Sequence, residues 1–337
     1  MVERCLVTGA NGFLGVELVG QLINRGFSVR ALLLPDEKPK FQNVNVEIVF
    51  GNVCDESAVL AAAKNIDYVF HLASIYQETL AGSPYPVAMY ETNVRGTENV
   101  CRVALHFKVR KLIYTSSAGT VGVETGNLSA DETVEFNCLS RRSHYEKSKA
   151  LAEKAALSYH SKGLSVVSLN PSFLIGPGDD RPTPTGAMIL NYLWGKYPCY
   201  FDGAFHFSGV REVAKAHIDA LERGRSGEKY LLCSDDPVTV RDFFAAMEAV
   251  SGIKRPRLKL PLKLLMTAGY LQERFLMAFG PHANTSIVLP YEILRYMALG
   301  CRYNNSKAKE ELGYLSGDLK EILKDSVEWF RSRYDPI

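Results

Sequence analysis

Short apolar runs alternate with amphipathic stretches through the first half of the chain. The runs are rich in Val, Ile and Leu, which is typical of strands buried on both faces of a parallel sheet. Strands are predicted over residues 4–9, 28–34, 44–50, 66–73, 111–117 and 164–170. Apolar positions at helical spacing predict helices over residues 11–25, 56–65, 90–107 and 143–161. This alternation predicts an α/β fold with a doubly wound parallel sheet covered on both faces.

The pattern changes after Pro171. Residues 170–186 are rich in Pro and Gly and predict a long loop. Later segments are mostly helical, with short strands expected near 204–208 and 229–233. We therefore predict a sheet domain over 1–172, rejoined by segments near 204–234, and a smaller, discontinuous substrate-binding lobe over 173–337.

A glycine-rich turn, VTGANGFLG, links the first predicted strand to the first predicted helix. Gly9 permits a tight turn, Gly12 lets the backbone approach a diphosphate, and Gly15 lets the helix pack close to the sheet. The free N–H groups at the helix start then face the anion. A purely structural turn is the alternative, but this context favours a Rossmann-type dinucleotide site. Its expected contacts are Gly9, Asn11, Gly12, Phe13, Leu14 and Gly15.

The end of the second predicted strand should select the dinucleotide. A carboxylate there favours NAD, and an arginine nearby favours NADP. The sequence LLPD at 33–36 has neither in the usual place, while Arg30, Lys38 and Lys40 could reach a phosphate. The absence of a blocking carboxylate gives NADP a slight preference over NAD.

Three tyrosine–lysine pairs have the spacing that puts both side chains on one face of a helix. They are Tyr145 with Lys149, Tyr192 with Lys196, and Tyr303 with Lys307. A lysine cation one turn away lowers the pKa of a phenol, which suits the phenol to proton transfer at a carbonyl or alcohol.

Only the first pair has suitable neighbours. It follows the strand that ends in Ser116 and Ser117, at the edge where parallel sheets hold ligands. The second pair lies where a helix ends, and the third is expected at the start of a polar, surface helix. We therefore assign the chemistry to Tyr145 and Lys149.

These motifs together resemble the extended short-chain dehydrogenase/reductases of the NAD-dependent epimerase/dehydratase family. They are the glycine turn, Asn93 in ETNVRGT, YTSSAG at 114–119, and Tyr145-x-x-x-Lys149. The segments RPTPTG, HIDALERGRSGEKYLL and NNSKAKEELGY are most similar to dihydroflavonol-reductase-like and hopanoid-associated sugar epimerase-like proteins. The resemblance implies an NAD(P)-dependent enzyme acting on a small molecule.

The resemblance also implies roles for particular residues. Tyr145 would be the acid/base, and Lys149 would hold the nicotinamide ribose and tune the phenol. Ser117 would bond the substrate carbonyl, with Ser116 as a close competitor, while Asn93 would either support the site or brace its helix. Further cofactor contacts would be Asn52 and Val53 at the adenine, Leu72, Ala73 and Ser74 along the cofactor, and Pro171 and Ser172 at the nicotinamide. The family usually has Asp where this chain has Asn52.

Three reactions compete for such a site. Dehydratases carry an Asp-Glu pair where this chain has Ala118 and Gly119. The resembling epimerases carry an arginine within the strand that here contains residues 204–207. Reduction of a small, largely apolar ketone or aldehyde is therefore favoured, with nucleotide-sugar epimerisation and a non-catalytic NAD(P)-binding sensor as alternatives. Two aromatic segments, 74–90 and 189–207, are expected to line the substrate pocket.

Net charge, cysteine content and apolar segments limit which partners and which cellular location are expected. A formal net charge of +2 gives no basic surface for nucleic acid. Seven scattered cysteines predict a reduced, cytoplasmic protein without metal, and no signal peptide or spanning helix is expected. Residues 254–280 carry basic groups and then an apolar helical stripe, which could cover the substrate or touch lipid. Because residues 272–274 interrupt the stripe, membrane contact is not the favoured interpretation. The resemblance also suggests a homodimer.

Overall fold

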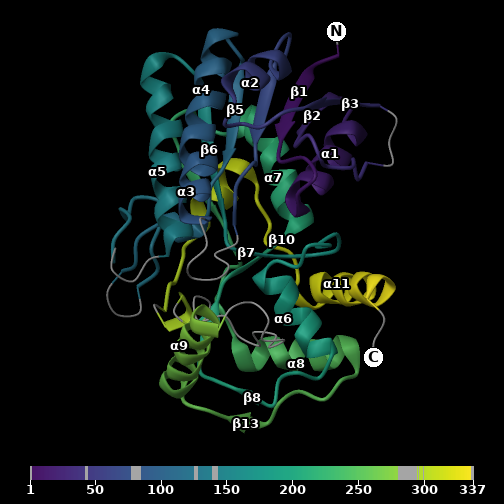
Figure 1. Cartoon of the computed structure of the whole chain (residues 1–337), viewed down its shortest axis with the longest axis vertical. Coiled ribbons are helices and arrows are strands. Elements are labelled where there is room, and N and C mark those ends of the chain that lie inside the picture. The colour runs from purple at the N-terminus through teal and green to yellow at the C-terminus, as the bar shows by residue number, and fades with distance from the viewer. Residues whose placement is uncertain are drawn as a thin grey trace.

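The computed structural model describes residues 2–41, 45–76, 85–124, 128–138, 143–279, 294, 296–298 and 300–334. A seven-stranded sheet runs through its upper half, with the strand order β11-β6-β5-β4-β1-β2-β3 (Figure 1). All of its strand pairs are parallel. The strands are β1 (Arg4–Thr8), β2 (Ser28–Leu33), β3 (Val46–Phe50), β4 (Tyr68–His71), β5 (Lys111–Thr115), β6 (Val166–Pro171) and β11 (Lys229–Leu232).

Helices cover both faces of this sheet, which confirms the predicted doubly wound fold. On one face, α1 (Phe13–Asn24) and α7 (Val210–Arg223) bury residues such as Leu18 and Val213. On the other face, α2 (Glu56–Ala62), α4 (Gly96–His106) and α5 (His144–Ser158) bury residues such as Val59, Val103 and Ala152. Burial on both faces explains why the strands are almost uniformly apolar.

Local sequence signals fix where these helices begin. Asp55 caps α2, because its Oδ1 accepts a hydrogen bond of 2.9 Å from the Ser57 N–H. Ser143 and Glu146 form a reciprocal capping box at the start of α5. The helix predicted over 90–107 begins earlier in the structure, at Tyr85. It consists of α3 (Tyr85–Tyr90), a π-helical turn (Glu91–Arg95) and α4.

The order of strands reverses between β1 and β4, which lie side by side in the sheet. At such a switch point the connections leave in opposite directions, and a crevice opens beyond the carboxyl ends of the strands. Buried hydrogen bonds join this edge to α4: the Thr8 hydroxyl lies 2.7 Å from His71 Nδ1, and the Thr97 hydroxyl lies 2.9 Å from His71 Nε2. The glycine turn therefore opens onto this crevice.

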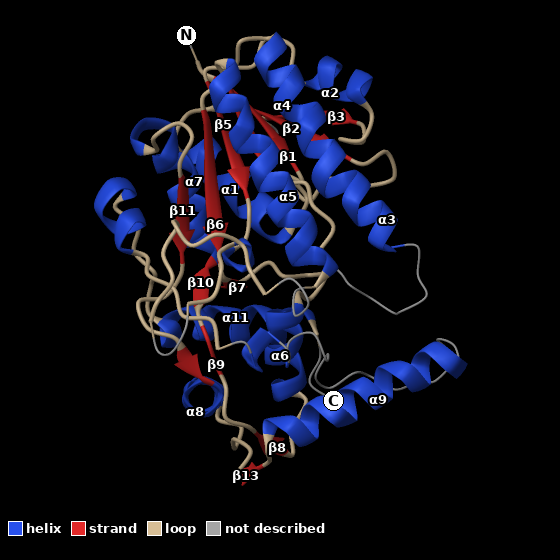
Figure 2. Cartoon of the chain, turned by 90° about the vertical axis from the view of Figure 1, so that its left-hand side faces the viewer, coloured by secondary structure: helices blue, strands red, loops and turns tan. Residues whose placement is uncertain are grey.

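A second hydrophobic core lies below the sheet, in the lobe seen in Figures 1 and 2. It is built from α6 (Pro184–Leu193), α8 (Val240–Ser251) and α11 (Leu319–Arg333). Short pairs of strands complete the lobe: β7 (Phe173–Ile175) with β10 (Phe207–Gly209), β8 (Cys199–Tyr200) with β13 (Leu258–Lys259), and β9 (Ala204–Phe205) with β12 (Val238–Thr239).

One prediction about the second half of the chain is wrong. The expected loop over 170–186 contains β7, because Phe173–Ile175 finds a partner in β10, more than thirty residues further along the chain. The aromatic segment 189–207 contributes to the core of the lobe, since Tyr192, Tyr197 and Phe205 are buried there. Residues 77–84 of segment 74–90 lie outside the described residues.

Among the described residues, no helix is both long and apolar enough to cross a membrane.

The close packing of Gly15 can be tested with a matched pair of substitutions in α1. A Cβ at Gly15 would lie 2.3 Å from the Gly9 carbonyl oxygen, whereas a Cβ at the exposed Gly20 has nothing within 4 Å. We expect Gly15→Ala to lower the free energy of unfolding by about 1–3 kcal/mol. Gly20→Ala should raise it by about 0.5–1 kcal/mol, because it improves helix propensity alone. Denaturant unfolding measures both, and equal effects would contradict the packing argument.

Candidate active site

The glycine turn at the end of β1 has the geometry of an anion cradle. Gly9 has a φ of 69°, and a Cβ there would lie 2.7 Å from the backbone N of Ala73, at the end of β4. Gly12 is the N-cap of α1, with no side-chain cap and no acidic residue in the first turn of the helix. The first N–H groups of α1 are therefore left for an external acceptor, and the helix dipole favours a negative one.

Two buried hydroxyls at the same edge lack partners. Within the described residues, Ser74 Oγ and Ser116 Oγ have no hydrogen-bond partner. They lie just beyond β4 and β5, which are neighbours in the sheet. Buried hydroxyls are almost always satisfied in the working form of a protein. These orphaned groups and the open glycine turn together fit a polar ligand as extended as a dinucleotide.

Tyr145 and Lys149 stand one turn apart on α5, next to the end of β5. The Tyr145 ring packs edge-on against Tyr76, with 4.6 Å between the ring centroids. Lys149 is only 3% exposed; its Nζ donates a 2.6 Å hydrogen bond to the Thr115 carbonyl and lies 4.5 Å above the centroid of the Tyr114 ring. Helix, strand and loop thus converge on one tyrosine–lysine pair.

The two candidate serines differ in exposure. Ser116 is buried, whereas Ser117 is half-buried and its Oγ accepts a 3.2 Å hydrogen bond from the Gly119 N–H. That bond caps the short helix Ala118–Thr120 and fixes the direction of the hydroxyl. Ser117 is therefore the more accessible of the two hydroxyls.

Known proteins share the sequence pattern and the fold of this chain. Residues 5–233 match the model of the NAD dependent epimerase/dehydratase family. The chain belongs to this family. It is therefore an enzyme of the extended short-chain dehydrogenase/reductase type, whose members bind NAD.

Two curated relatives and two solved structures illustrate the family. The chain is 31% identical to a putative dihydroflavonol 4-reductase of Synechocystis sp., over 98% of this chain and 96% of the relative. It is 29% identical to sterol demethylase protein B of Methylococcus capsulatus, over 97% and 98%. The crystal structure of gox2253 is 32% identical with a TM-score of 0.83, covering 98% of this chain and 99% of that one. A Thermotoga maritima UDP-glucose 4-epimerase with UDP-glucose, at 23% identity, 98% and 99% coverage and a TM-score of 0.76, shares the fold.

Asn93 links two segments beside the site in this member of the epimerase/dehydratase family. Its Oδ1 accepts a 2.7 Å hydrogen bond from the Ile75 N–H, and its Nδ2 donates to the Ile75 carbonyl at 3.1 Å and to Ser148 Oγ at 2.9 Å. The Ser148 hydroxyl in turn donates to the Tyr145 carbonyl at 2.8 Å. The π-helical turn thus ties the loop after β4 to the helix of the tyrosine.

Asn11 and two of the three expected phosphate-binding cations are bonded to other groups of the protein. Asn11 holds the loop after β2, since its Nδ2 donates to the Lys38 carbonyl at 2.9 Å and its Oδ1 accepts from the Lys40 N–H at 3.1 Å. The Lys40 ammonium forms a 2.7 Å ion pair with Asp180. Arg30 forms a 2.9 Å ion pair with Glu47. Of the three cations, only Lys38 is solvent-exposed.

The other predicted cofactor residues follow the carboxyl ends of β3, β4 and β6. Leu72, Ala73 and Ser74 follow β4, and the Leu72 N–H is bonded to the Thr8 carbonyl at 3.2 Å. Asn52 is exposed and bonds the Cys54 N–H at 2.9 Å, whereas Val53 is buried. Pro171 ends β6, and the Ser172 hydroxyl lies 2.8 Å from the Ser208 hydroxyl. These residues border one edge of the sheet.

The two rejected tyrosine–lysine pairs have structural roles. The Tyr192 hydroxyl donates to the Ile253 carbonyl at 2.5 Å, and Lys196 lies over the Trp194 ring. Tyr303 is 2% exposed, so its predicted surface position is wrong: it forms a bridge with Ala130 that folds it inward. In the described part of the chain, no cluster of three or more His, Cys, Asp or Glu could hold a metal ion.

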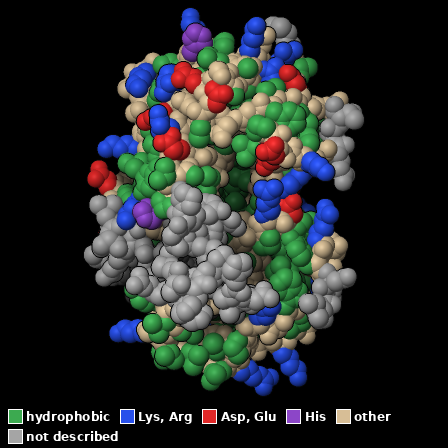
Figure 3. Space-filling view, in the orientation of Figure 1, with side chains coloured by type: hydrophobic (Ala, Val, Ile, Leu, Met, Phe, Trp, Pro, Cys, Tyr) green, Lys and Arg blue, Asp and Glu red, His purple; other side chains and the backbone are tan. Residues whose placement is uncertain are grey.

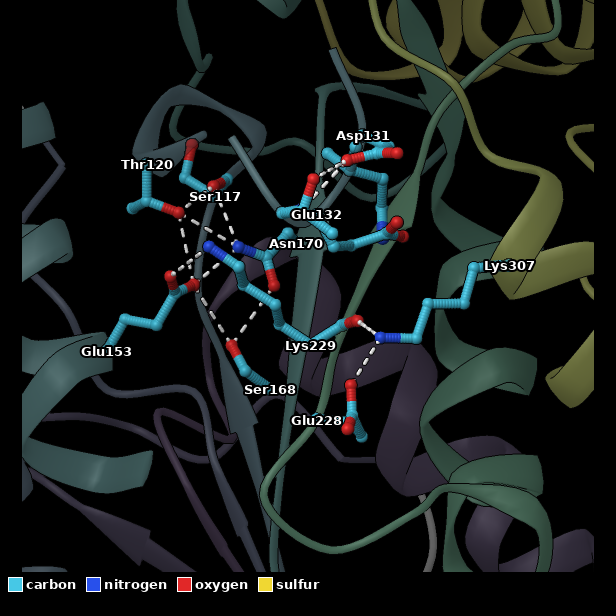
Figure 4. A network of polar contacts seen from close by, with 12 residues as sticks. Ser117, Thr120, Asp131, Glu132, Glu153, Ser168, Asn170, Glu228, Lys229 and Lys307 are labelled. Atoms are coloured by element: carbon cyan, nitrogen blue, oxygen red, sulfur yellow. Dashed lines mark hydrogen bonds and ion pairs between the residues drawn. The ribbon is translucent and has the colours of Figure 1, made fainter. Parts of the chain in front are cut away.

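A buried polar network beside the site was not predicted. The Glu153 Oε2 accepts hydrogen bonds from Thr120 at 3.0 Å, from Ser168 at 3.1 Å and from Asn170 (Figure 4). The Asn170 amide also donates to the Ser117 carbonyl at 3.2 Å, and the Lys229 Nζ lies 3.7 Å from Glu153 Oε1. The carboxylate thus holds together the end of β5, strand β6 and helix α5. Its place four residues after Lys149 was the only sequence signal for this role.

Burial and the Glu153 carboxylate act in opposite directions on the pKa of Lys149. Burial lowers the pKa of Lys149 to about 7, and the Glu153 carboxylate opposes part of this decrease. Because an unfolded lysine titrates near 10.4, the unfolded chain binds more protons than the folded chain between about pH 7 and pH 10. This group therefore makes the fold more stable as the pH rises through that window.

We expect the free energy of unfolding of the wild type to rise, relative to Lys149→Met, by roughly 1 kcal/mol per pH unit between about pH 7.5 and pH 9. Denaturant unfolding of the protein without added dinucleotide measures this difference. Lys154→Met, at an exposed position of the same helix, should track the wild type. A pH-independent difference for Lys149→Met would mean that this lysine keeps its ordinary pKa.

Proposed function

We propose that this enzyme is an NAD(P)-dependent reductase that converts a ketone or aldehyde of a small, largely apolar substrate into an alcohol. The observation that carries the proposal is the position of Lys149: one turn from Tyr145 on α5, it bonds the Thr115 carbonyl at the end of β5, two residues before Ser117, in the sheet whose β1 ends in the glycine turn. A proton donor, a cation and a hydroxyl beside a dinucleotide cradle are the groups that carbonyl reduction requires.

Each group has a separate task. A bound reduced nicotinamide would supply the hydride for the carbonyl carbon. The Tyr145 hydroxyl gives its proton to the carbonyl oxygen, and the Ser117 hydroxyl donates a hydrogen bond to the same oxygen. The Lys149 ammonium favours the phenolate that remains, because an opposite charge nearby stabilises an anion. The product has gained one hydride and one proton, which balances the reduction, and the phenolate regains its proton from solvent.

The lobe supports an apolar substrate. Phe205 lies in the strand segment where the resembling epimerases carry an arginine, and it packs edge-on against Phe173 at 5.4 Å between ring centroids. His206 beside it is also buried, with its Nδ1 2.8 Å from the Ser234 carbonyl oxygen. This segment therefore offers no cation to a diphosphate. The relatives whose names refer to dihydroflavonol and sterol substrates agree with a poorly charged substrate.

The choice between NADP and NAD rests on the loop after β2. The slight preference for NADP now depends on Lys38, because Arg30 and Lys40 are held in ion pairs. Glu37 lies in the same loop, and its Oε2 accepts a 3.2 Å hydrogen bond from the Leu34 N–H just after β2. If Lys38 binds the 2′-phosphate, NADPH will bind more tightly than NADH, and Lys38→Met will remove the difference.

We expect Tyr145→Phe to lower carbonyl reduction by at least about a hundredfold, since general acid catalysis contributes on that order. Binding of the reduced dinucleotide should persist, because the cradle is untouched. Oxidation of NADPH and of NADH, followed by absorbance across a panel of aromatic and alicyclic ketones and aldehydes, measures turnover, and dinucleotide fluorescence measures binding.

Matched controls come from the other two pairs. Lys196→Met and Lys307→Met should leave reduction largely unchanged, because these lysines lie over Trp194 and beside Glu228. Full activity of Tyr145→Phe would overturn the assignment of the proton donor. Interconversion of nucleotide sugars without net oxidation of the dinucleotide would replace the reductase by an epimerase.

A further inference from the structure

Helix α9 (Leu262–Phe279), at the end of the lobe, exposes an apolar stripe. Leu264 is 55% exposed and Leu271 is 60% exposed, with the exposed Ala268 between them at helical spacing. Leu258, just before the helix in β13, is 58% exposed. Exposed apolar groups that are contiguous, unlike scattered ones, mark an interaction surface.

The opposite side of this helix is anchored. Leu262, Leu265 and Met266 pack against the hydrophobic core of the lobe, and Gly269 is buried. The helix is therefore apolar on two sides, one of which already has a partner. Core packing accounts for Leu265 and Met266, but it does not account for Leu264 and Leu271.

The same end of the molecule is basic. Lys254, Arg255, Arg257, Lys259 and Lys263 lie between Glu248 and Glu273, and no acidic residue lies between those two. Arg255 is paired with Glu248 at 3.3 Å and Lys259 with Asp202 at 2.7 Å. Lys254, Arg257 and Lys263 are exposed. Figure 3 shows hydrophobic side chains gathered at the lower end of the molecule, with Lys and Arg side chains at the edge.

A cavity of about 330 Å³ lies next to this surface. Arg241, Arg255 and Arg257 line it together with Glu248, so its lining carries three positive charges and one negative charge. Pairing of β13 with β8 places it directly beside Leu258. Guanidinium groups arranged around such a cavity suit a phosphate, which they can bind through two hydrogen bonds at once.

We propose that this end of the lobe docks on an anionic phospholipid surface. The exposed stripe of α9 would lie among the upper acyl chains, and the arginine-lined cavity and neighbouring lysines would face the phosphate headgroups. Two effects hold a helix with an apolar face beside a basic face at such an interface. The apolar face is buried among the acyl chains, and the cations are attracted to the anionic headgroups. The exposed residues that support the proposal, from Leu258 to Leu271, all precede the polar residues 272–274, which the sequence-based expectation took to interrupt the stripe.

A second copy of the chain fits this surface less well. A twofold contact would bring the exposed Lys254, Arg257 and Lys263 of each copy together, and like charges repel. An anionic lipid surface instead neutralises them while covering the apolar stripe. The proposal does not depend on the substrate or on the reductase activity.

Sedimentation of the full chain with vesicles tests the proposal. We expect binding to phosphatidylcholine vesicles that contain phosphatidylglycerol, weaker binding to pure phosphatidylcholine, and a loss of binding as salt is raised. The double variants Leu264→Ser with Leu271→Ser, and Arg257→Glu with Lys263→Glu, should each lower the bound fraction about tenfold or more.

Matched changes at exposed positions elsewhere serve as controls. Leu128→Ser with Leu315→Ser, and Lys64→Glu with Lys320→Glu, should bind like the wild type. All variants should keep the wild-type affinity for the dinucleotide, which shows that they fold. Failure of the wild type to sediment, equal binding to neutral and anionic vesicles, or equal losses in control and test variants would overturn the proposal. So would a change from dimer to monomer in the Leu264→Ser and Leu271→Ser variant with vesicle binding unaltered.

Discussion

The buried ammonium of Lys149 is the constraint around which the site is organised. A cation taken out of water loses its proton more readily, and hydrogen bonds and opposite charge oppose that loss. Here the Thr115 carbonyl, the Tyr114 ring and the Glu153 carboxylate provide them. Because these groups come from β5 and α5, the lysine can be held only where that strand and that helix meet.

The polar groups around Lys149 also help to position Ser117 and Tyr145. Glu153 holds Asn170, whose amide donates to the Ser117 carbonyl, so the turn that directs the serine rests on the carboxylate beside the lysine. Asn93 fixes the other side, because it joins the loop after β4 to the helix that carries Tyr145. Tyrosine, lysine and serine are thus positioned by a buried polar network instead of by isolated contacts.

Much of this could be predicted from the sequence where the signal is local. The glycine turn, the Asp55 cap, the strands of the sheet and the spacing of Tyr145 and Lys149 depend on residues within a few positions of one another. The burial of Tyr303, the strand pairing of Phe173–Ile175 and the partners of Glu153 depend on contacts between distant segments, for which one sequence has no periodic pattern. The burial of Tyr192, Tyr197 and Phe205 in the lobe could not be predicted from their residue types, because a core and a pocket are lined by the same types.

The aromatic packing of Phe205 limits how this scaffold can diverge. An arginine in its place would bury a guanidinium between Phe173 and Phe243, whose rings lie 5.4 Å and 5.6 Å from Phe205. An unpaired buried charge costs several kcal/mol, on the order of the whole stability of a domain. A lineage with this core could therefore not acquire an affinity for charged sugar donors by a single substitution there, and would first have to loosen or replace the surrounding rings.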